Sequence, residues 1–382
     1  MITNPVLLIL IKASIRLNML WLIFSVYQRP GKIRYVFKRI ISIKRSEERN
    51  RKVKKFALKG NRLFMAINIP GWPSRQFNKF IKNEILRLEN SESDKTRLQT
   101  VFFETTGKCR LNCKHCSNAG NHNNNGKARG EVLENILLKV KDEGIPHIQF
   151  TGGEPLEDFD MLLKLIRRAD RMDTWVLSSG FELTKEKARA LKKAGLVGVN
   201  ISLDHWNEQE HNKFRGNDEA FSWAKRAILN CKNEGLLISI SLCATKEFTT
   251  EENLAKFLEL SKKMRVHFIR ILEPKQTGLY LKGDNRLSLA QLQLLEDFFF
   301  SDICNRNDKT TPILMYPDLM NREKCIGKGD RYLYINMDGL VHPCPFSFTG
   351  TNNILELSFK SINNDLSKED CINCNVYKGS LN

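Results

Sequence analysis

The sequence predicts an α/β protein built on a parallel sheet. From about residue 99, short apolar runs typical of strands alternate with stretches of helical periodicity. The six strand candidates are residues 100–104, 147–150, 174–177, 198–203, 236–242 and 266–272. Between the first two, apolar residues recur at i, i+3, i+4 and i+7, namely Leu133, Ile136, Leu137 and Val140. Strands joined by helices pair in parallel through right-handed crossovers. Periodicity alone leaves a doubly wound sheet open.

The chain begins with a long apolar segment. Residues 6–27 are long enough to span a bilayer. Lys12 and Arg16 interrupt the segment, and they share one helix face because they are one turn apart. The segment is therefore also compatible with a helix lying in the membrane interface, with Trp21 and Tyr27 at headgroup depth.

The positive charge of the chain is concentrated in the same region. Residues 1–100 contain 22 Lys and Arg against 6 Asp and Glu, whereas the remaining residues contain 39 against 37. Within residues 28–62, fourteen cations face only Glu47 and Glu48, a pattern attracted to anionic lipid. A solvated helix face and a partner-docking helix remain alternatives. Nucleic-acid binding is disfavoured because the basic stretch directly follows a long apolar segment. We therefore expect a membrane-associating arm at 1–62.

The segment between the arm and the first strand candidate reads as a helical lead-in, residues 63–98. Residues 70–73, Pro-Gly-Trp-Pro, punctuate it, and residues 77–88 have an amphipathic pattern. The apolar N-terminal stretch has no basic segment before it and no small-residue cleavage site after it. We therefore expect a cytoplasmic protein with reduced cysteines, attached to the inner face of the membrane by residues 1–62.

Three cysteines follow the first predicted strand directly. Cys109, Cys113 and Cys116 have the spacing CxxxCxxC. Soft thiolates select iron–sulfur clusters, zinc or cuprous copper, and three ligands leave one iron of a cubane open for a further ligand. A zinc knuckle with His115 or His122 as the fourth ligand is the alternative.

This triplet resembles the signature of the radical S-adenosylmethionine (SAM) superfamily, with His115 at the position just before the last cysteine. The run Gly152, Gly153, Glu154 resembles the GGE motif of that family, which binds the SAM amino group. The resemblance implies an open (β/α)6 partial barrel over residues 99–308. It also implies a 4Fe-4S cluster whose fourth iron chelates SAM, and reductive cleavage of SAM to methionine and a hydrogen-abstracting 5'-deoxyadenosyl radical.

Polar residues follow the ends of several predicted strands. In parallel barrels, ligand sites gather at that edge of the sheet. By resemblance, Ser178, Ser179, Ser202 and Asp204 are candidates for contacts with the SAM ribose or carboxylate. Turn or cap roles are equally open for each serine alone. Arg215 is a candidate for bidentate pairing with a carboxylate, and a structural salt bridge is its alternative.

Four further cysteines lie near the C-terminus, around a predicted hairpin at residues 332–341. They resemble the ligands of the twitch domain, the shortened SPASM domain, and imply an auxiliary 4Fe-4S cluster over residues 309–382; the four are Cys325, Cys344, Cys371 and Cys374. Judged on the ligands alone, a structural zinc is the alternative.

The resemblance implies a radical SAM enzyme with an external one-electron donor such as a flavodoxin or ferredoxin. We expect a peptide or protein substrate, as in maturases. The alternatives are radical chemistry on a lipid or small membrane-associated metabolite, and a non-enzymatic iron–sulfur electron carrier. The sequence does not identify a catalytic acid or base.

Overall fold

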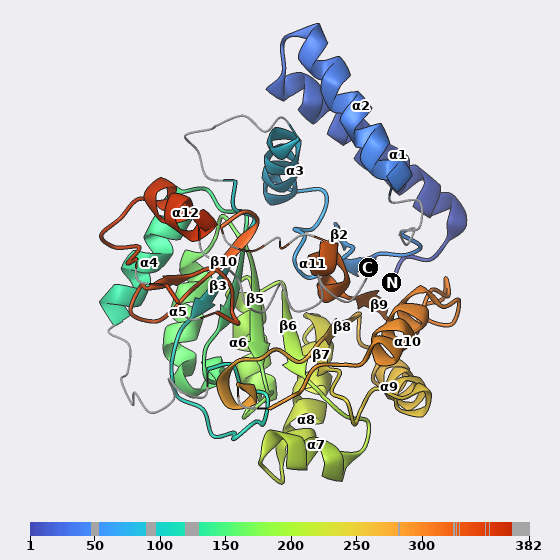
Figure 1. Ribbon diagram of the computed structural model, residues 1–382, viewed down its shortest axis with the longest axis vertical. Helices are drawn as coiled ribbons and strands as arrows, with labels where there is room; N and C mark the ends of the chain where they lie inside the picture. The colour runs from blue at the N-terminus through green and yellow to red at the C-terminus, as the bar shows by residue number, and fades with distance from the viewer. Residues whose placement is uncertain are drawn as a thin grey trace.

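Figure 1 shows the computed structural model of the protein, which describes residues 1–46, 53–88, 97–118, 130–281, 283–323, 325, 327, 329–347, 349–350 and 352–368. A nine-stranded sheet forms its centre, in the order β11-β10-β3-β4-β5-β6-β7-β8-β9. The strands of this sheet are β3 (Thr100–Glu104), β4 (His147–Thr151), β5 (Asp173–Ser178), β6 (Gly198–Ser202), β7 (Leu237–Cys243), β8 (Phe268–Leu272), β9 (Ile313–Met315), β10 (Tyr332–Ile335) and β11 (Val341–His342).

The six predicted strands are all present, as β3 to β8, and they pair in parallel in chain order. A doubly wound sheet would reverse the strand order at a switch point. The sequential order therefore confirms the partial-barrel class. The sheet also extends past residue 308, because β9 pairs in parallel with β8 and β10 pairs in parallel with β3.

Helices cover one face of this sheet. Alternate strand residues such as Val101, Phe150 and Val199 share a core with the crossover helices, while Phe102, Trp175 and Asn200 face the other way and lie outside that core. The predicted helix is α4 (Gly130–Asp142), and its four periodic residues are all buried in this core. The other helices of the barrel region are α5 (Phe159–Arg168), α6 (Lys185–Lys193), α7 (Glu208–Arg215), α8 (Ala220–Asn233), α9 (Glu251–Met264) and α10 (Leu289–Phe300).

A short antiparallel hairpin packs against the starts of the barrel strands. Its strands are β1 (Ala57–Lys59) and β2 (Arg62–Phe64), so the predicted boundary after residue 62 lies inside this hairpin. Phe64 shares a small core with Trp175, Leu237 and Phe268 of β5, β7 and β8. Arg62 forms an ion pair with Asp173, the first residue of β5. The hairpin therefore covers the N-terminal end of the barrel.

Two long helices and one shorter helix lie beyond that hairpin: α1 (Pro5–Val26), α2 (Pro30–Ser46) and α3 (Arg75–Arg87). They stand off from the barrel at the end opposite α7 (Figure 1). Ser74 caps α3 by accepting a hydrogen bond from the Phe77 amide. One core links α1 to Phe56, Leu63 and Phe77, and another links it to α2 and Ile85. Among the described residues, α1 is the one helix that is long and apolar enough to cross a membrane.

The structure corrects the placement of Tyr27. This residue is 5% exposed, and its hydroxyl donates to the Ile85 carbonyl at 3.4 Å. Tyr27 is therefore held inside the helical region and is not available at headgroup depth. Trp21, in contrast, is 61% exposed.

The C-terminal region contains the predicted hairpin, formed by β10 and β11. Helices α11 (Pro317–Glu323) and α12 (Phe359–Lys368) flank it in the chain. Val341, Ile354 and Ile362 belong to the main core of the barrel. This region therefore packs onto the barrel as an extension of its sheet.

Candidate active site

The loop that carries the three cysteines, residues 109–116 and here named the cysteine loop, follows β3. The end of α7 holds it in place. The Asn112 amide donates to the Arg215 carbonyl at 3.2 Å, and the Lys114 amide donates to the Phe214 carbonyl at 3.2 Å. Helix α7 ends at Gly216 with φ +66°, and a Cβ there would lie 2.8 Å from the Asn112 carbonyl oxygen. Gly216 therefore lets the helix end approach the cysteine loop closely.

The three thiols of this loop share one environment. Cys113 is 7% exposed, and Cys109 and Cys116 are half-buried. Burial raises the pKa of the Cys109 thiol to about 12, and the Glu154 carboxylate and the other two thiols of the triplet add to the rise. Cys109 therefore lies near both the Glu154 carboxylate and the other two thiols.

The two glycines before Glu154 bring the β4 loop against the segment that leads into the cysteine loop. The Gly153 amide donates to the Thr106 carbonyl and the Glu154 amide to the Lys108 carbonyl, both at 2.7 Å. A Cβ on Gly152 would lie 2.4 Å from the Thr106 oxygen, and one on Gly153 would lie 2.2 Å from the Lys108 oxygen. In this structure the close approach that requires glycine is therefore between two protein loops.

Four hydrogen bonds hold the buried Glu154 carboxylate. Oε1 accepts from the Ser178 hydroxyl at 2.7 Å and from the Leu156 amide at 3.2 Å. Oε2 accepts from the Ser179 amide at 2.7 Å and from the Ser179 hydroxyl at 2.5 Å. Burial nevertheless outweighs these bonds and raises the pKa of Glu154. The two serines and the Leu156 amide thus orient the Glu154 carboxylate. Their four hydrogen bonds occupy about as many acceptor positions as a carboxylate has.

Arg215 connects Asp204 to the cysteine triplet. Its guanidinium binds Asp204 Oδ2 through Nε at 2.6 Å and Nη2 at 2.5 Å, and its Nη1 lies 3.5 Å from Cys113 Sγ. Burial alone would raise the pKa of Asp204, but the Arg215 cation outweighs it and holds that pKa below its usual value. Asp204 Oδ1 also accepts from the Cys243 amide at 2.9 Å. The carboxylate partner of Arg215 is thus a protein residue, which matches the structural salt bridge of the sequence analysis.

His115 packs beside this ion pair. Its ring stacks on Phe214 with centroids 4.7 Å apart. Burial, together with the nearby Arg215 cation, lowers the pKa of His115 to about 4, so the ring is neutral. Its Nδ1 is buried, with no hydrogen-bond partner among the residues that the structure describes. An orphaned buried nitrogen beside the cysteine triplet fits a site that receives a ligand.

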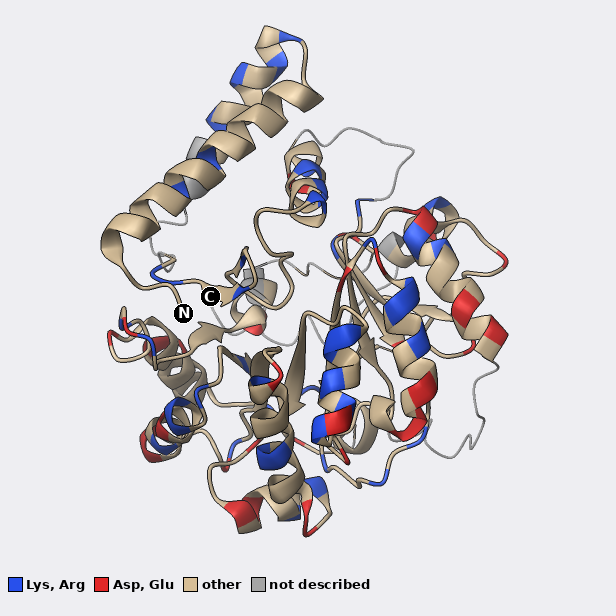
Figure 2. Ribbon diagram, turned by 180° about the vertical axis from the view of Figure 1, so that it is seen from behind, with Lys and Arg blue, Asp and Glu red and all other residues tan. Residues whose placement is uncertain are grey.

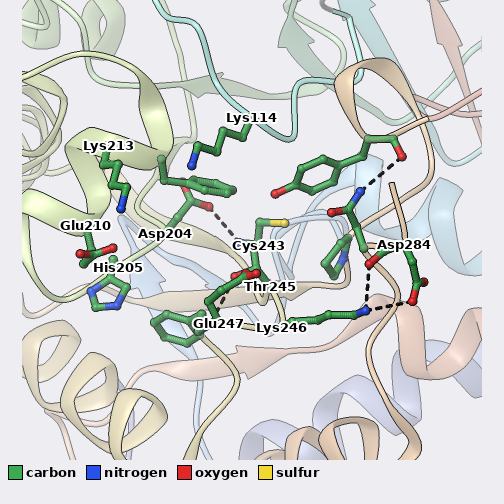
Figure 3. Close-up of a pocket in the computed structure, with 15 residues that line it drawn as sticks. Lys114, Asp204, His205, Glu210, Lys213, Cys243, Thr245, Lys246, Glu247 and Asp284 are labelled. Carbon is green, nitrogen blue, oxygen red and sulfur yellow. Dashed lines mark hydrogen bonds and ion pairs between the residues drawn. The ribbon is translucent and has the colours of Figure 1, made fainter. Parts of the chain in front are cut away.

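A cavity of about 470 Å³ lies beside the cysteine loop (Figure 3). Asp204 and Cys243 line it from the ends of β6 and β7, while Lys114 extends into it from the cysteine loop and Lys213 from α7. The wall also carries the carboxylates of Glu210, Glu247 and Asp284 and the rings of His205, Phe214, Phe248 and Tyr280. The cavity therefore offers charged groups of both signs next to aromatic surface.

Ser202 takes part neither in the hydrogen bonds around Glu154 nor in those around Arg215 and Asp204. It is half-buried at the end of β6, in register with Ser241 of β7. In the described part of the chain, its hydroxyl makes no hydrogen bond to Glu154 or Asp204. The predicted residues therefore form two linked groups, one around Glu154 and one around Arg215, and Ser202 belongs to neither.

Sequence reasoning missed two charged residues inside the barrel. Arg270 lies in the middle of β8, in register with Ser241, and its guanidinium lies 6.0 Å from the Phe102 ring centroid across the barrel. Glu104 ends β3 with 2% exposure and accepts from Asn118 Nδ2 at 2.9 Å. Arg270 could have been found from the sequence, because it interrupts the apolar run Phe-Ile-Arg-Ile-Leu. Side chains alternate between the two faces of a strand, so this arginine falls on the face opposite the two isoleucines, inside the barrel.

The structure describes two of the four predicted auxiliary cysteines, Cys325 and Cys344. Cys344 is 5% exposed just after β11, and the Phe346 amide points at its Sγ from 3.4 Å. Cys325 is half-buried. Cys371 and Cys374 lie outside the described residues.

The donor set at the cysteine loop fits a cluster better than a single zinc ion. Zinc needs four donors that converge on one point. Within the described residues, which do not include His122, no three His, Cys, Asp or Glu side chains converge in that way. The thiolates of a cubane bind separate irons, so three nearby thiols need not converge. The cluster would be held by Cys109, Cys113 and Cys116.

Gly153→Ala should disrupt this site. The new Cβ would collide with the backbone at Lys108, just before the cysteine loop, and overpacking of this kind costs about 1–3 kcal/mol. We expect a lower melting temperature and reduced iron content after anaerobic reconstitution. Gly31→Ala is the matched control, because a Cβ there meets nothing within 4 Å. Wild-type iron content in Gly153→Ala would contradict the close approach.

Comparison with known proteins agrees with this site. The model of the radical SAM superfamily matches residues 103–268, which include the cysteine loop and the strand ends around it. The GTP 3',8-cyclase of Aquifex aeolicus is 23% identical over 271 residues, covering 66% of this chain and 83% of that protein. The AdoMet-dependent heme synthase of Nitratidesulfovibrio vulgaris is 24% identical over 288 residues, covering 69% and 77%.

Solved structures share the fold. Streptococcus suis SuiB bound to S-adenosylmethionine superposes with a TM-score of 0.59 at 16% identity, covering 75% of this chain and 70% of that one. The anSMEcpe structure with bound AdoMet gives a TM-score of 0.54 at 21% identity, covering 69% and 80%. On the family match, the strand order and the cysteine loop, this chain belongs to the radical SAM superfamily and is a radical SAM enzyme.

Proposed function

We propose that Cys109, Cys113 and Cys116 hold the SAM-binding 4Fe-4S cluster and that Glu154 provides the negative charge that receives the SAM amino group. The observation that carries this proposal is the hydrogen bond from the Glu154 amide to the Lys108 carbonyl at 2.7 Å, which places the buried Glu154 beside the first cysteine of the triplet. When bound, the cluster and SAM supply one-electron reductive cleavage and a hydrogen-abstracting 5'-deoxyadenosyl radical. An external donor such as a flavodoxin or ferredoxin would deliver the electron.

Protein residues orient and shield this site. Ser178 and Ser179 fix the Glu154 carboxylate, so an ammonium group would share one of its oxygens or displace a serine hydroxyl. Arg215 donates toward Cys113 Sγ, and a cation beside a thiolate favours its charged form. A Cβ on Gly278 would lie 1.8 Å from the Cys116 carbonyl oxygen, so the segment after β8 packs directly on the cysteine loop and limits water access.

The substrate that the site suits best is a peptide. The cavity beside the cysteine loop combines Lys114 and Lys213 with acidic and aromatic side chains, a mixture suited to a peptide segment. Solved neighbours include SuiB bound to its precursor peptide SuiA and anSMEcpe bound to the peptide Cp18Cys. These structures support a maturase-type reaction on a peptide or protein.

A small-molecule substrate is the second candidate, because the curated relatives are named for GTP and heme chemistry. Mass spectrometry of peptides and metabolites from a deletion strain separates the two. A peptide that is modified in the wild-type strain and unmodified in the deletion strain supports the first candidate. An accumulated small metabolite with an unmodified peptide pool supports the second.

We further propose that Cys325, Cys344, Cys371 and Cys374 hold an auxiliary 4Fe-4S cluster of the twitch type. The amide of Phe346 pointing at Cys344 Sγ supports a thiolate at that position, because such donors stabilise sulfur ligands. Such a cluster would accept an electron from the substrate.

Cys344→Ala should uncouple SAM cleavage from modification of the substrate. We expect 5'-deoxyadenosine release within about threefold of wild type with loss of modified product, since the first cluster is held by other residues. Iron content should fall by about half, because one of two equal clusters is lost. Full product formation by Cys344→Ala would contradict the auxiliary cluster.

A further inference from the structure

Helix α1 has two opposed apolar faces. One packs onto the rest of the protein through Leu8, Ile11, Ile15, Leu22 and Ile23. The other, here named the outer stripe, is exposed by more than half; its side chains are Val6 at 67%, Leu10 at 59%, Leu17 at 66%, Trp21 at 61% and Phe24 at 58%. Steps of three, four and seven residues keep all five on one side of a helix.

Helix α1, which carries the outer stripe, and helix α2, which packs against it, have only basic charged residues. Residues 1–46 contain nine Lys and Arg and no Asp or Glu. On α2 the basic side chains of Lys32, Arg34, Lys38 and Arg39 are all exposed, and Figure 2 shows blue segments recurring along this helix with no red. An apolar stripe flanked only by cations is typical of a helix that lies on an anionic lipid surface.

Other occupants fit this surface less well. A second copy docked stripe to stripe would bring nine further cations against the first nine, which is repulsive. A spanning orientation would require α1 to leave the body of the protein. That would expose Phe56 and Phe77, which α1 now covers, and break the hydrogen bond from Asn18 to Asn78 at 2.8 Å.

We propose that the outer stripe docks this enzyme onto an anionic membrane surface, with α1 in the plane of the interface. This inference is independent of the proposed substrate. The helices join the barrel through β1 and β2, which contact the starts of the strands, whereas the site residues follow the strand ends. Docking therefore turns the site away from the lipid (Figure 1). The substrate then enters from the aqueous side, which disfavours a membrane-embedded substrate.

Flotation of the full-length protein with vesicles tests the docking surface. The vesicles contain either phosphatidylcholine alone or phosphatidylcholine with phosphatidylglycerol. We expect binding to the anionic vesicles only, weakened by salt. Point variants are preferable to deletion of residues 1–62, because β1 and β2 cover the end of the barrel.

Leu10→Ser/Leu17→Ser/Trp21→Ser should lower vesicle affinity by roughly tenfold or more, because three apolar insertions are lost. Leu138→Ser/Leu229→Ser/Leu289→Ser is the matched control, since these residues are 41%, 54% and 55% exposed on the barrel helices α4, α8 and α10. Arg34→Glu/Lys38→Glu/Arg39→Glu keeps the stripe and should lower affinity by roughly a hundredfold, at about fivefold per basic residue. All three variants should retain wild-type 5'-deoxyadenosine release, which shows that they fold.

Several outcomes would overturn the proposal. They are equal flotation of the stripe variant and wild type, absence of binding to anionic vesicles, and resistance of the bound protein to alkaline carbonate extraction, which indicates a spanning helix. A wild-type dimer that the stripe variant converts to a monomer in gel filtration would assign the surface to a second copy instead.

Discussion

Cys113→Ala is expected to abolish 5'-deoxyadenosine formation, to the level of the protein-free background. Cys113 is the most buried thiol of the triplet and the one that Arg215 contacts. Without it, two thiols remain, and a cubane that must leave one iron open for SAM lacks a third protein ligand. The measurement is chromatography of anaerobic reactions that contain SAM and a strong reductant.

Cys231→Ala provides the matched control for this experiment. Cys231 is fully buried in α8, within the main core, so its replacement removes the same atom without touching the loop. We expect wild-type 5'-deoxyadenosine release with only a modest loss of stability. Equal release by Cys113→Ala and wild type would show that the triplet does not hold the reactive cluster.

Glu154→Gln is expected to lower SAM affinity by about tenfold to a hundredfold, because a hydrogen bond to a charged group contributes about 1.5–3 kcal/mol. The amide removes the buried negative charge and also presents an NH2 group to a donor, either at Ser179 or at Leu156 and Ser178. Equilibrium binding of SAM to the reconstituted protein measures the effect, and iron content should remain near wild type.

Ser179→Ala separates orientation of the carboxylate from its charge. This variant loses one hydroxyl contact but keeps the Ser179 amide bond and the Glu154 charge. We expect a loss of SAM affinity of about fivefold, from about 1 kcal/mol for one hydrogen bond. If Glu154→Gln bound SAM as tightly as wild type, Glu154 would serve only to join two loops.

Much of the barrel could be predicted because local sequence patterns indicate its strands. Each of the six predicted strands alternates with a helix, and the parallel pairing follows from the crossovers. The cysteine spacing and the Gly-Gly-Glu run were also local signals, so the residues that follow β3 and β4 could be named from the sequence.

Contacts between distant segments could not be predicted. Arg215 was a candidate for a ligand carboxylate, but only the fold shows that Asp204 already occupies its guanidinium. The docking of Phe64 against the strand starts depends on a hairpin of three-residue strands, too short to give a periodic signal. Tyr27 looked like an interfacial residue until the packing of α1 on α3 placed it in a core.

Electron paramagnetic resonance of the reduced wild-type protein, recorded before and after addition of SAM, tests the central assignment most directly. If the cysteine triplet holds a cluster with one open iron, SAM should bind that iron and change the spectrum of this cluster, while Glu154→Gln should require more SAM for the same change. A spectrum that SAM leaves unchanged, or a protein that contains zinc and no iron at the triplet, would contradict the account.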